Sequence, residues 1–216
     1  MIRAAIWAAS ILAAVRALIG TGNPAKIREH LELLADLPVE WVTPRELGTP
    51  PEVEETGATF VENALIKARA YAAWSGLPTL ADDGGLAIDA LGGEPGVKSK
   101  RWIGGRDSSD EALIAYTLER MRGMPPERRD AAMLIAVVFV DGGCEVVGEG
   151  AIRGYIPTEP SPKRDDGFPF RSVFKVRPFD RYYIDLTPEE HAAVNHRHRA
   201  VEPIRAYLER LGPRLA

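Results

Sequence analysis

The sequence predicts an α/β domain built on a mixed β-sheet. Strand-like and helix-like segments alternate in its early part, which favours parallel strands joined by helices. Further along, two long apolar runs meet at Asp141-Gly142-Gly143, a pattern typical of an antiparallel hairpin. A sheet that contains both arrangements is mixed.

The first strand is expected at 15–20 and the first helix directly after it. Asn23 is a good N-cap, and Pro24 is well tolerated at the first helical position. The helix carries an apolar stripe, formed by Ile27, Leu31 and Leu34.

A longer helix is expected at 60–74. Thr59 and Glu62 match the capping box, in which each side chain satisfies a free backbone N–H of the first turn. Gly76 and Pro78 then end the helix.

The other elements follow from the same patterns of apolar residues and breakers. Strands are expected at 39–43, 79–82, 86–90, 131–140, 144–153 and 181–186. Helices are expected at 109–122, from 187 onward and at 200–211, and loops at 44–58, 92–105 and 157–169.

Composition limits the classes of function. The chain has 216 residues, which fits one sizeable domain, expected at 15–216. Its formal net charge is -4, whereas proteins that wrap a nucleic acid polymer usually carry a surplus of basic residues. A nucleic acid polymer is therefore not expected as a partner. The single cysteine, Cys144, rules out a disulfide framework and favours a reducing, cytoplasmic setting.

Residues 1–14 are apolar and resemble a weak signal peptide or an amphipathic anchor. The apolar run continues into the first expected strand, however, and Arg16 interrupts it. We therefore expect a short extension on a soluble protein, without a membrane partner, because no later stretch is long enough to span a bilayer.

The segment 21–26 (TGNPAK) lies at a strand-to-helix turn, where backbone N–H groups bind phosphate and Lys26 adds a positive charge. A plain capped helix explains the same residues. The glycines and Ala25 also satisfy G-x-G-x-x-A, the dinucleotide fingerprint, with Glu40 downstream. That interpretation is disfavoured because Glu40 falls early in its strand and repeated βαβ units do not follow.

Two further segments carry acids. Asn63 and Lys67 are four residues apart and share a helix face. Asp82 and Asp83 are adjacent in what reads as a tight glycine turn, and adjacent carboxylates repel unless a cation or proton lies between them. With Glu55 they suggest a Mg²⁺ site beside a carboxylate base, although an Asp-Asp-Gly turn without function fits equally well.

A polar cluster, His191 followed by 195–199 (NHRHR), suits phosphate or purine edges, or is simply a solvated helix junction.

Taken together, the four segments resemble the Ham1 family of inosine triphosphate pyrophosphatases. The matching runs are 21–26 (TGNPAK), 54–68 (EETGATFVENALIKA), 80–97 (LADDGGLAIDALGGEPGV) and 195–197 (NHR). The resemblance implies an elongated mixed sheet, two lobes with a nucleotide cleft between them, and a homodimer. It also implies Mg²⁺-dependent release of pyrophosphate from a nucleoside triphosphate such as ITP, dITP or XTP.

The resemblance assigns roles residue by residue. Asp83 matches the acceptor of the proton from the attacking water, and Glu55, Asp82 and Asp83 match the metal site. The substrate-binding positions are Thr21, Gly22, Asn23, Lys26, Lys67, Gly84, Phe168, Phe170, Arg171, His191, His196 and Arg197.

Departures from the family pattern gather on the base side. Gly84 stands where a serine is usual, and 167–174 (GFPFRSVF) replaces G-F-G-Y-D-P-x-F, so that Arg171 replaces an acid. His191 replaces a lysine, Asn195 a serine, and Lys98 and Lys100 replace tyrosine and alanine. We therefore expect retained pyrophosphohydrolysis with an altered base preference. A nucleotide-binding module without turnover and a dinucleotide-dependent oxidoreductase remain as alternatives.

Overall fold

A single open sheet runs through the protein. The computed structural model describes residues 15–105 and 107–211. Within them seven strands lie in the order β2-β1-β3-β4-β5-β6-β7, with β1 parallel to β2 and β3 and the later neighbours antiparallel. The strands are β1 (Val15–Ile19), β2 (Val39–Val42), β3 (Thr79–Ile88), β4 (Asp130–Asp141), β5 (Cys144–Tyr155), β6 (Lys175–Val176) and β7 (Arg181–Tyr182). The predicted mixed α/β class is confirmed.

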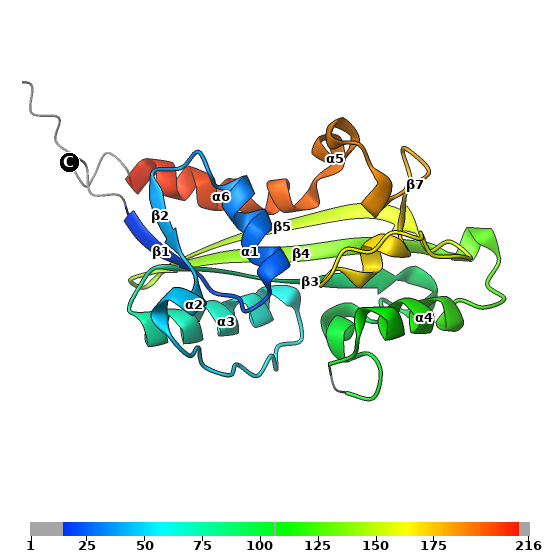
Figure 1. Ribbon diagram of the computed structural model, residues 1–216, viewed down its shortest axis with the longest axis horizontal. Helices are drawn as coiled ribbons and strands as arrows, with labels where there is room; N and C mark the ends of the chain where they lie inside the picture. Colours follow the sequence, from blue (N-terminus) through cyan, green and yellow to red (C-terminus); the bar gives the residue numbers. More distant parts are fainter. Residues whose placement is uncertain (1–14, 106, 212–216) are drawn as a thin grey trace, which may run out of the picture.

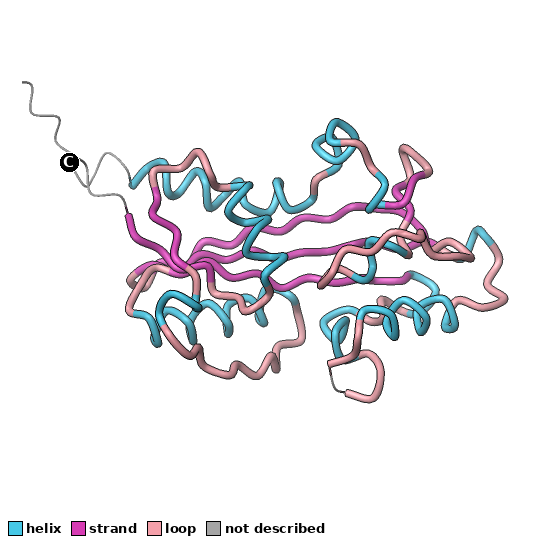
Figure 2. The backbone as a smooth tube through the Cα atoms, viewed as in Figure 1, coloured by secondary structure: helices cyan, strands magenta, loops and turns pink. Residues whose placement is uncertain are grey.

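Helices cover both faces of this sheet (Figure 1). They are α1 (Pro24–Leu33), α2 (Pro44–Leu47), α3 (Phe60–Ser75), α4 (Asp110–Arg120), α5 (Pro188–Val194) and α6 (His196–Leu211). In this view α5 and α6 lie above the strands, α1 crosses in front of them, and α2, α3 and α4 lie below. The long strands β3, β4 and β5 join two groups of elements, with β1, β2 and α3 at one end and α4, β6 and β7 at the other (Figure 2).

The alternation of side chains along β4 explains the two layers. Ile135, Val137 and Phe139 pack toward α6, whereas Ala136 and Val138 pack toward α3. Because both faces are covered, the strand reads as an almost continuous apolar run.

Two glycines of β5 let α6 pack unusually close to the sheet. A Cβ atom on Gly148 would lie 2.0 Å from the carbonyl oxygen of Ala200, and one on Gly150 would lie 1.9 Å from that of His196. Any larger residue at either position would therefore push α6 away from β5.

Most local signals were predicted correctly. Asn23 caps α1, and Thr59 with Glu62 forms the capping box of α3, which ends at Gly76 in the left-handed conformation. The predicted hairpin is β4–β5.

Some predictions of local structure were wrong. The segment 79–90 is one strand, β3, through residue 88, so Asp82-Asp83-Gly84-Gly85 is not a turn. The last helix begins at His196 rather than at Ala200, and only 181–182 of the strand expected at 181–186 is extended and paired.

No helix within 15–105 and 107–211 is long and apolar enough to cross a membrane. The extension predicted at 1–14 lies outside the described residues.

Candidate active site

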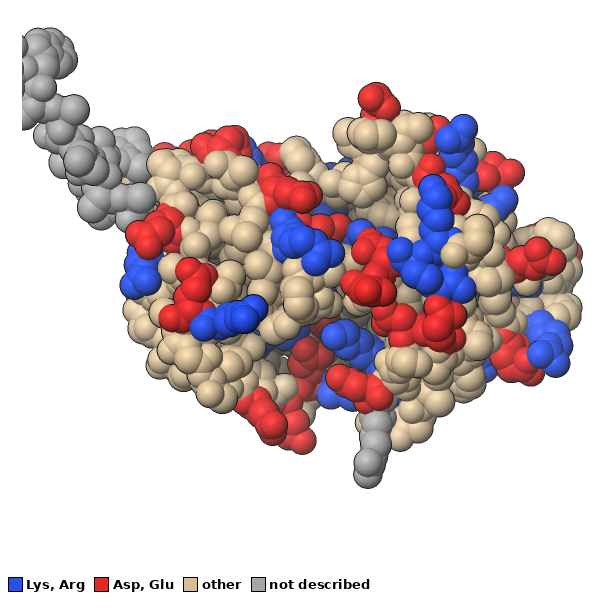
Figure 3. Space-filling model, viewed as in Figure 1, with Lys and Arg blue, Asp and Glu red and all other residues tan. Residues whose placement is uncertain are grey.

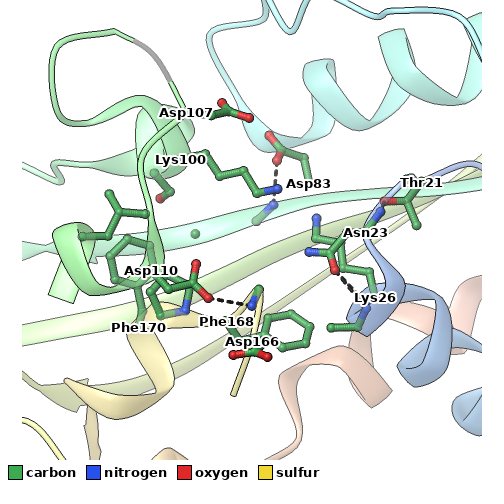
Figure 4. A pocket seen from close by; sticks show the side chains of 18 of the residues that line it. Thr21, Asn23, Lys26, Asp83, Lys100, Asp107, Asp110, Asp166, Phe168 and Phe170 are labelled. Carbon is green, nitrogen blue, oxygen red and sulfur yellow. Dashed lines mark hydrogen bonds between the residues drawn. The ribbon is translucent and has the colours of Figure 1, made fainter. Parts of the chain in front are cut away.

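A cavity of about 1070 Å³ lies where the start of α1, the middle of β3 and the loop before β6 come together. Figure 4 shows polar side chains around it: Asp83, Lys100 and Asp107 on one side, Thr21, Asn23 and Lys26 on another, and Phe168 and Phe170 on a third. On the surface, Lys and Arg side chains intermix with Asp and Glu around the hollowed middle of this face (Figure 3).

Asp83 is the acid that β3 presents to the cavity from the α3 side of the sheet. The side-chain amide of Asn63 donates to its Oδ2 at 3.2 Å, and the Gly84 N–H donates to its Oδ1 at 2.9 Å. Burial raises the pKa of Asp83, and nearby Glu55 adds to the rise, which outweighs the opposite effect of Lys67 and Lys26. The carboxylate is therefore held in one orientation and is a better proton acceptor than an ordinary aspartate.

Glu55 and Lys67 form an ion pair beside Asp83. Lys67 Nζ lies 2.7 Å from Glu55 Oε1 and donates to the carbonyl oxygen of Asp82 at 2.9 Å. Burial raises the pKa of Glu55, but Lys67, Lys26 and Arg101 together lower it by more. Burial also lowers the pKa of Lys67, but Asp82 and Glu55 raise it by more, so the pair stays charged.

Asp82 lies on the opposite face of β3, as the alternation of a strand requires. Its side chain is fully buried and does not line the cavity. Lys26 Nζ lies 2.9 Å from Oδ2, His30 Nε2 lies 3.2 Å from Oδ1, and an Arg197 nitrogen lies 3.4 Å from Oδ2. The structure therefore brings Glu55 and Asp83 together but separates Asp82 from them.

The start of α1 forms the opposite wall. Asn23 Oδ1 accepts the N–H of Ala25 at 2.9 Å and that of Lys26 at 3.5 Å, so the cap itself uses N–H groups that the sequence had suggested for phosphate. Thr21, Gly22, Asn23 and Lys26 all line the cavity. Burial lowers the pKa of Lys26 although Asp82 raises it.

The donor set at this end fits a hard cation. Within the described ranges no three His, Cys, Asp or Glu side chains are placed to hold a metal ion. Mg²⁺ is commonly held by one or two carboxylates, with waters and substrate phosphates completing its shell. The oxygens of Glu55 and Asp83 at the same cavity meet that need, and the phosphates would supply the rest.

The far end of the cavity is aromatic and cationic. The guanidinium of Arg171 lies 3.7 Å from the ring centroid of Phe168, and that of Arg197 lies 5.1 Å from it. Arg171 pairs with Glu29 and, at 2.7 Å, with Asp165, so the positive charge introduced at this position is balanced.

The two predicted histidines differ in their placement. His196 lines the cavity, and burial together with Arg197 holds its pKa well below the usual range, which makes the ring neutral. His191 does not line the cavity; its Nε2 lies 2.7 Å from the hydroxyl of Tyr183.

Comparison with known proteins identifies the family of this chain. The model of the Ham1 family matches residues 17–207. The chain belongs to the Ham1 family. It is 42% identical over 201 residues to the dITP/XTP pyrophosphatase of Frankia alni, which covers 90% of this chain and 97% of that protein.

Solved structures agree with this assignment. The HAM1 protein of Coxiella burnetii superposes with a TM-score of 0.79 at 34% identity, over 91% of this chain and 99% of that one. The nucleoside-triphosphatase / dITP/XTP pyrophosphatase of Mycobacterium abscessus gives 0.70 at 42% identity, over 86% and 96%.

Most positions expected from the Ham1 pattern meet at the cavity, but the pattern missed several residues. Lys100, Arg101, Asp107 and Asp110 line it as well, and Glu29 supports Arg171. Lys100 has no ion-pair partner in the described part of the chain, and Figure 4 shows it reaching in beside Asp83. The basic run 98–101 was a usable signal, whereas no local pattern marked Glu29.

Proposed function

We propose that this chain is a nucleoside-triphosphate pyrophosphohydrolase that converts non-canonical purine nucleotides, ITP, dITP and XTP, to the monophosphate and pyrophosphate. The observation that carries the proposal is the division of one cavity into two ends. Carboxylates and lysines gather at one end, and an aromatic ring flanked by guanidinium groups lies at the other. The name of the Frankia alni relative, dITP/XTP pyrophosphatase, supports the substrate class.

The lysine end suits the triphosphate. Lys26 and Lys67 line it with their ammonium groups already fixed, by the buried Asp82 carboxylate and by Glu55 respectively, so little reorganisation is needed when phosphate charge develops. Lys100 adds a further cation at the cavity, and its side chain has no ion-pair partner among residues 15–105 and 107–211. Asn23 and Thr21 supply hydrogen-bond donors for phosphate oxygens.

Glu55 and Asp83 would hold Mg²⁺ in this proposal. When bound, the ion would offset phosphate charge and orient the chain of phosphates. Support comes from the oxygen character of the donors and from their shared cavity.

Asp83 is the proton acceptor. Water attacks the phosphorus next to the ribose, the new O–P bond forms as the bond to pyrophosphate breaks, and the water proton passes to the Asp83 carboxylate. Asn63 and Gly84 fix both oxygens of that carboxylate. Lys26 and Lys67 stabilise the charge that moves onto the leaving pyrophosphate.

Phe168 offers a ring on which the base stacks, and Arg197 with neutral His196 recognises its edge. Because Arg171 stands where an acid is usual in the family, we propose that the relative preference among ITP, dITP and XTP is shifted. His191 would act through Tyr183 rather than by touching the base.

A nucleotide-binding module without turnover is the second candidate. The base-side departures favour it, and the carboxylates and lysines gathered at the other end argue against it. The dinucleotide alternative is disfavoured because the sheet turns antiparallel after β3. We also propose a homodimer in the cytoplasm, testable by light scattering and by fractionation.

Product analysis tests the chemistry. ITP is hydrolysed in ¹⁸O-labelled water, and the products are analysed by ³¹P NMR. We expect the label in the monophosphate and none in the pyrophosphate. Nucleoside diphosphate with orthophosphate would contradict the proposal, and bound but unreacted ITP would favour the binding module.

A further inference from the structure

A largely buried series of alternating charges links the two ends of the cavity. Lys26 pairs with Asp82 at 2.9 Å, and Asp82 pairs with Arg197 at 3.4 Å. Arg197 Nε lies 2.9 Å from Glu29 Oε2, and Glu29 pairs with Arg171. The series therefore runs from a lysine at the phosphate end to an arginine at the base end.

We propose that Asp82 is a positioning residue that fixes Lys26 and Arg197 relative to one another, and not a ligand of the metal. The inference rests on the proposed function, since it concerns how that site binds a nucleotide.

Orientation and burial separate Asp82 from the metal end. Successive residues of a strand point to opposite faces, so Asp82 shares the face of Leu80 and Asp83 that of Ala81. The carboxylate of Asp82 is fully buried, and three basic side chains surround it. Reaching the cavity would require leaving all three.

The partners of Asp82 explain its role. Lys26 comes from α1 and Arg197 from the first turn of α6, two helices far apart in the sequence, and both side chains line the cavity. Without an anion between them these cations would repel one another in a buried setting. Asp82 thus sets the separation between a group for phosphate and a group for the base.

His30 completes the surroundings of the Asp82 carboxylate. Its ring is fully buried, with Nε2 3.2 Å from Oδ1, while Lys26 and Arg197 share Oδ2. The His30 ring thus lies beside Oδ1, and Oδ2 is left to the two functional cations.

The test compares Asp82→Asn with Asp83→Asn and uses Asp89→Asn, an exposed acid paired with Arg153, as the matched control. Mn²⁺ affinity is measured by electron paramagnetic resonance in the presence of the α,β-imido analogue of ITP, and KM and kcat are measured with ITP. We expect Asp82→Asn to keep Mn²⁺ affinity within about twofold while KM rises about tenfold or more, because charged hydrogen-bond partners are lost. Asp83→Asn should weaken Mn²⁺ by about tenfold or more.

Loss of Mn²⁺ affinity in Asp82→Asn equal to that in Asp83→Asn would overturn the proposal, as would an unchanged KM. If wild-type protein binds neither the analogue nor Mn²⁺, the proposed function fails and the inference falls with it. If only Asp82→Asn loses the ion, the proposed function stands and this inference alone fails.

Circular dichroism shows whether Asp82→Asn folds. If it does not, a double-mutant cycle of Lys26→Gln and Arg197→Gln replaces it. We expect the effect of the double variant on KM to depart from the product of the single effects by about threefold or more, because one acid couples the two cations. Independent effects would overturn the proposal.

Discussion

The contact between β5 and α6 gives a prediction that links packing to activity. In Gly150→Ala the new Cβ atom would lie 1.9 Å from the carbonyl oxygen of His196, whereas real Cβ contacts essentially never fall below 3.0 Å. The start of α6 must therefore move by about 1.1 Å or more. His196 and Arg197, which line the cavity, sit on that first turn.

Two magnitudes follow from this displacement. Overpacking of this kind costs about 1–3 kcal/mol, and each kcal/mol lowers Tm by about 2–4 °C in a chain of this size. A shift of about 1 Å in groups that position a substrate can cost about 100-fold in rate. We expect Gly150→Ala to lose several degrees in Tm and to lower kcat/KM for ITP by about 10- to 100-fold.

Thermal unfolding and pyrophosphate release measure the two effects. Glu149→Ala is the matched control, because Glu149 is an exposed neighbour on the same strand and should change neither quantity. A Gly150→Ala variant with wild-type Tm and wild-type kcat/KM would refute the packing argument.

Four further predictions concern the site itself. Asp83→Asn should lower kcat by about 100-fold or more, while the α,β-imido analogue of ITP still binds. Chelation of divalent metal should reversibly abolish turnover by the wild-type protein. Retained turnover in either experiment would count against the proposed chemistry. Arg171→Gln should change the ratio of kcat/KM for ITP to that for GTP by about tenfold. The variant loses the guanidinium that lies over the Phe168 ring and the ion pair with Glu29. An unchanged ratio would show that Arg171 does not take part in base selection. Burial raises the pKa of Glu29, but Arg197 and Arg171 lower it by more, so its stabilising effect is present above about pH 4.5 and is lost as the pH falls through the lowered pKa. Denaturant titrations should therefore show Glu29→Gln less stable than wild type at neutral pH, with a difference that shrinks in acid; a constant difference would contradict this.

The local elements were predictable because their signals are local. Caps such as Asn23 and the pair Thr59 and Glu62 satisfy backbone groups within one turn, and the structure uses them as the sequence indicates. The β4–β5 hairpin follows equally from its turn and its apolar runs.

The course of β3 could not be predicted because its glycines serve close approach rather than a turn. A Cβ atom on Gly84 would lie 2.6 Å from the Leu134 carbonyl oxygen, and one on Gly85 would lie 2.0 Å from Ser99 Oγ. The sequence shows only two acids followed by two glycines, which is typical of a turn. Once the segment is a strand, Asp82 and Asp83 must face opposite sides.

Glu29 shows the other limit of sequence reasoning. Its partners, Arg171 and Arg197, lie more than a hundred residues away in the chain, and no spacing rule connects them. The resemblance to the Ham1 family indicated residues at both ends of the cavity, but the contacts that join these ends emerge only from the packed structure.

Pyrophosphate release with Mg²⁺, compared across ITP, XTP, dITP, GTP, ATP, CTP and UTP, tests the central claim most directly. The account predicts that one or more of ITP, XTP and dITP is turned over with kcat/KM well above the four normal nucleotides. Equal or greater kcat/KM with GTP, ATP, CTP or UTP, or no pyrophosphate from any of the seven, would contradict it.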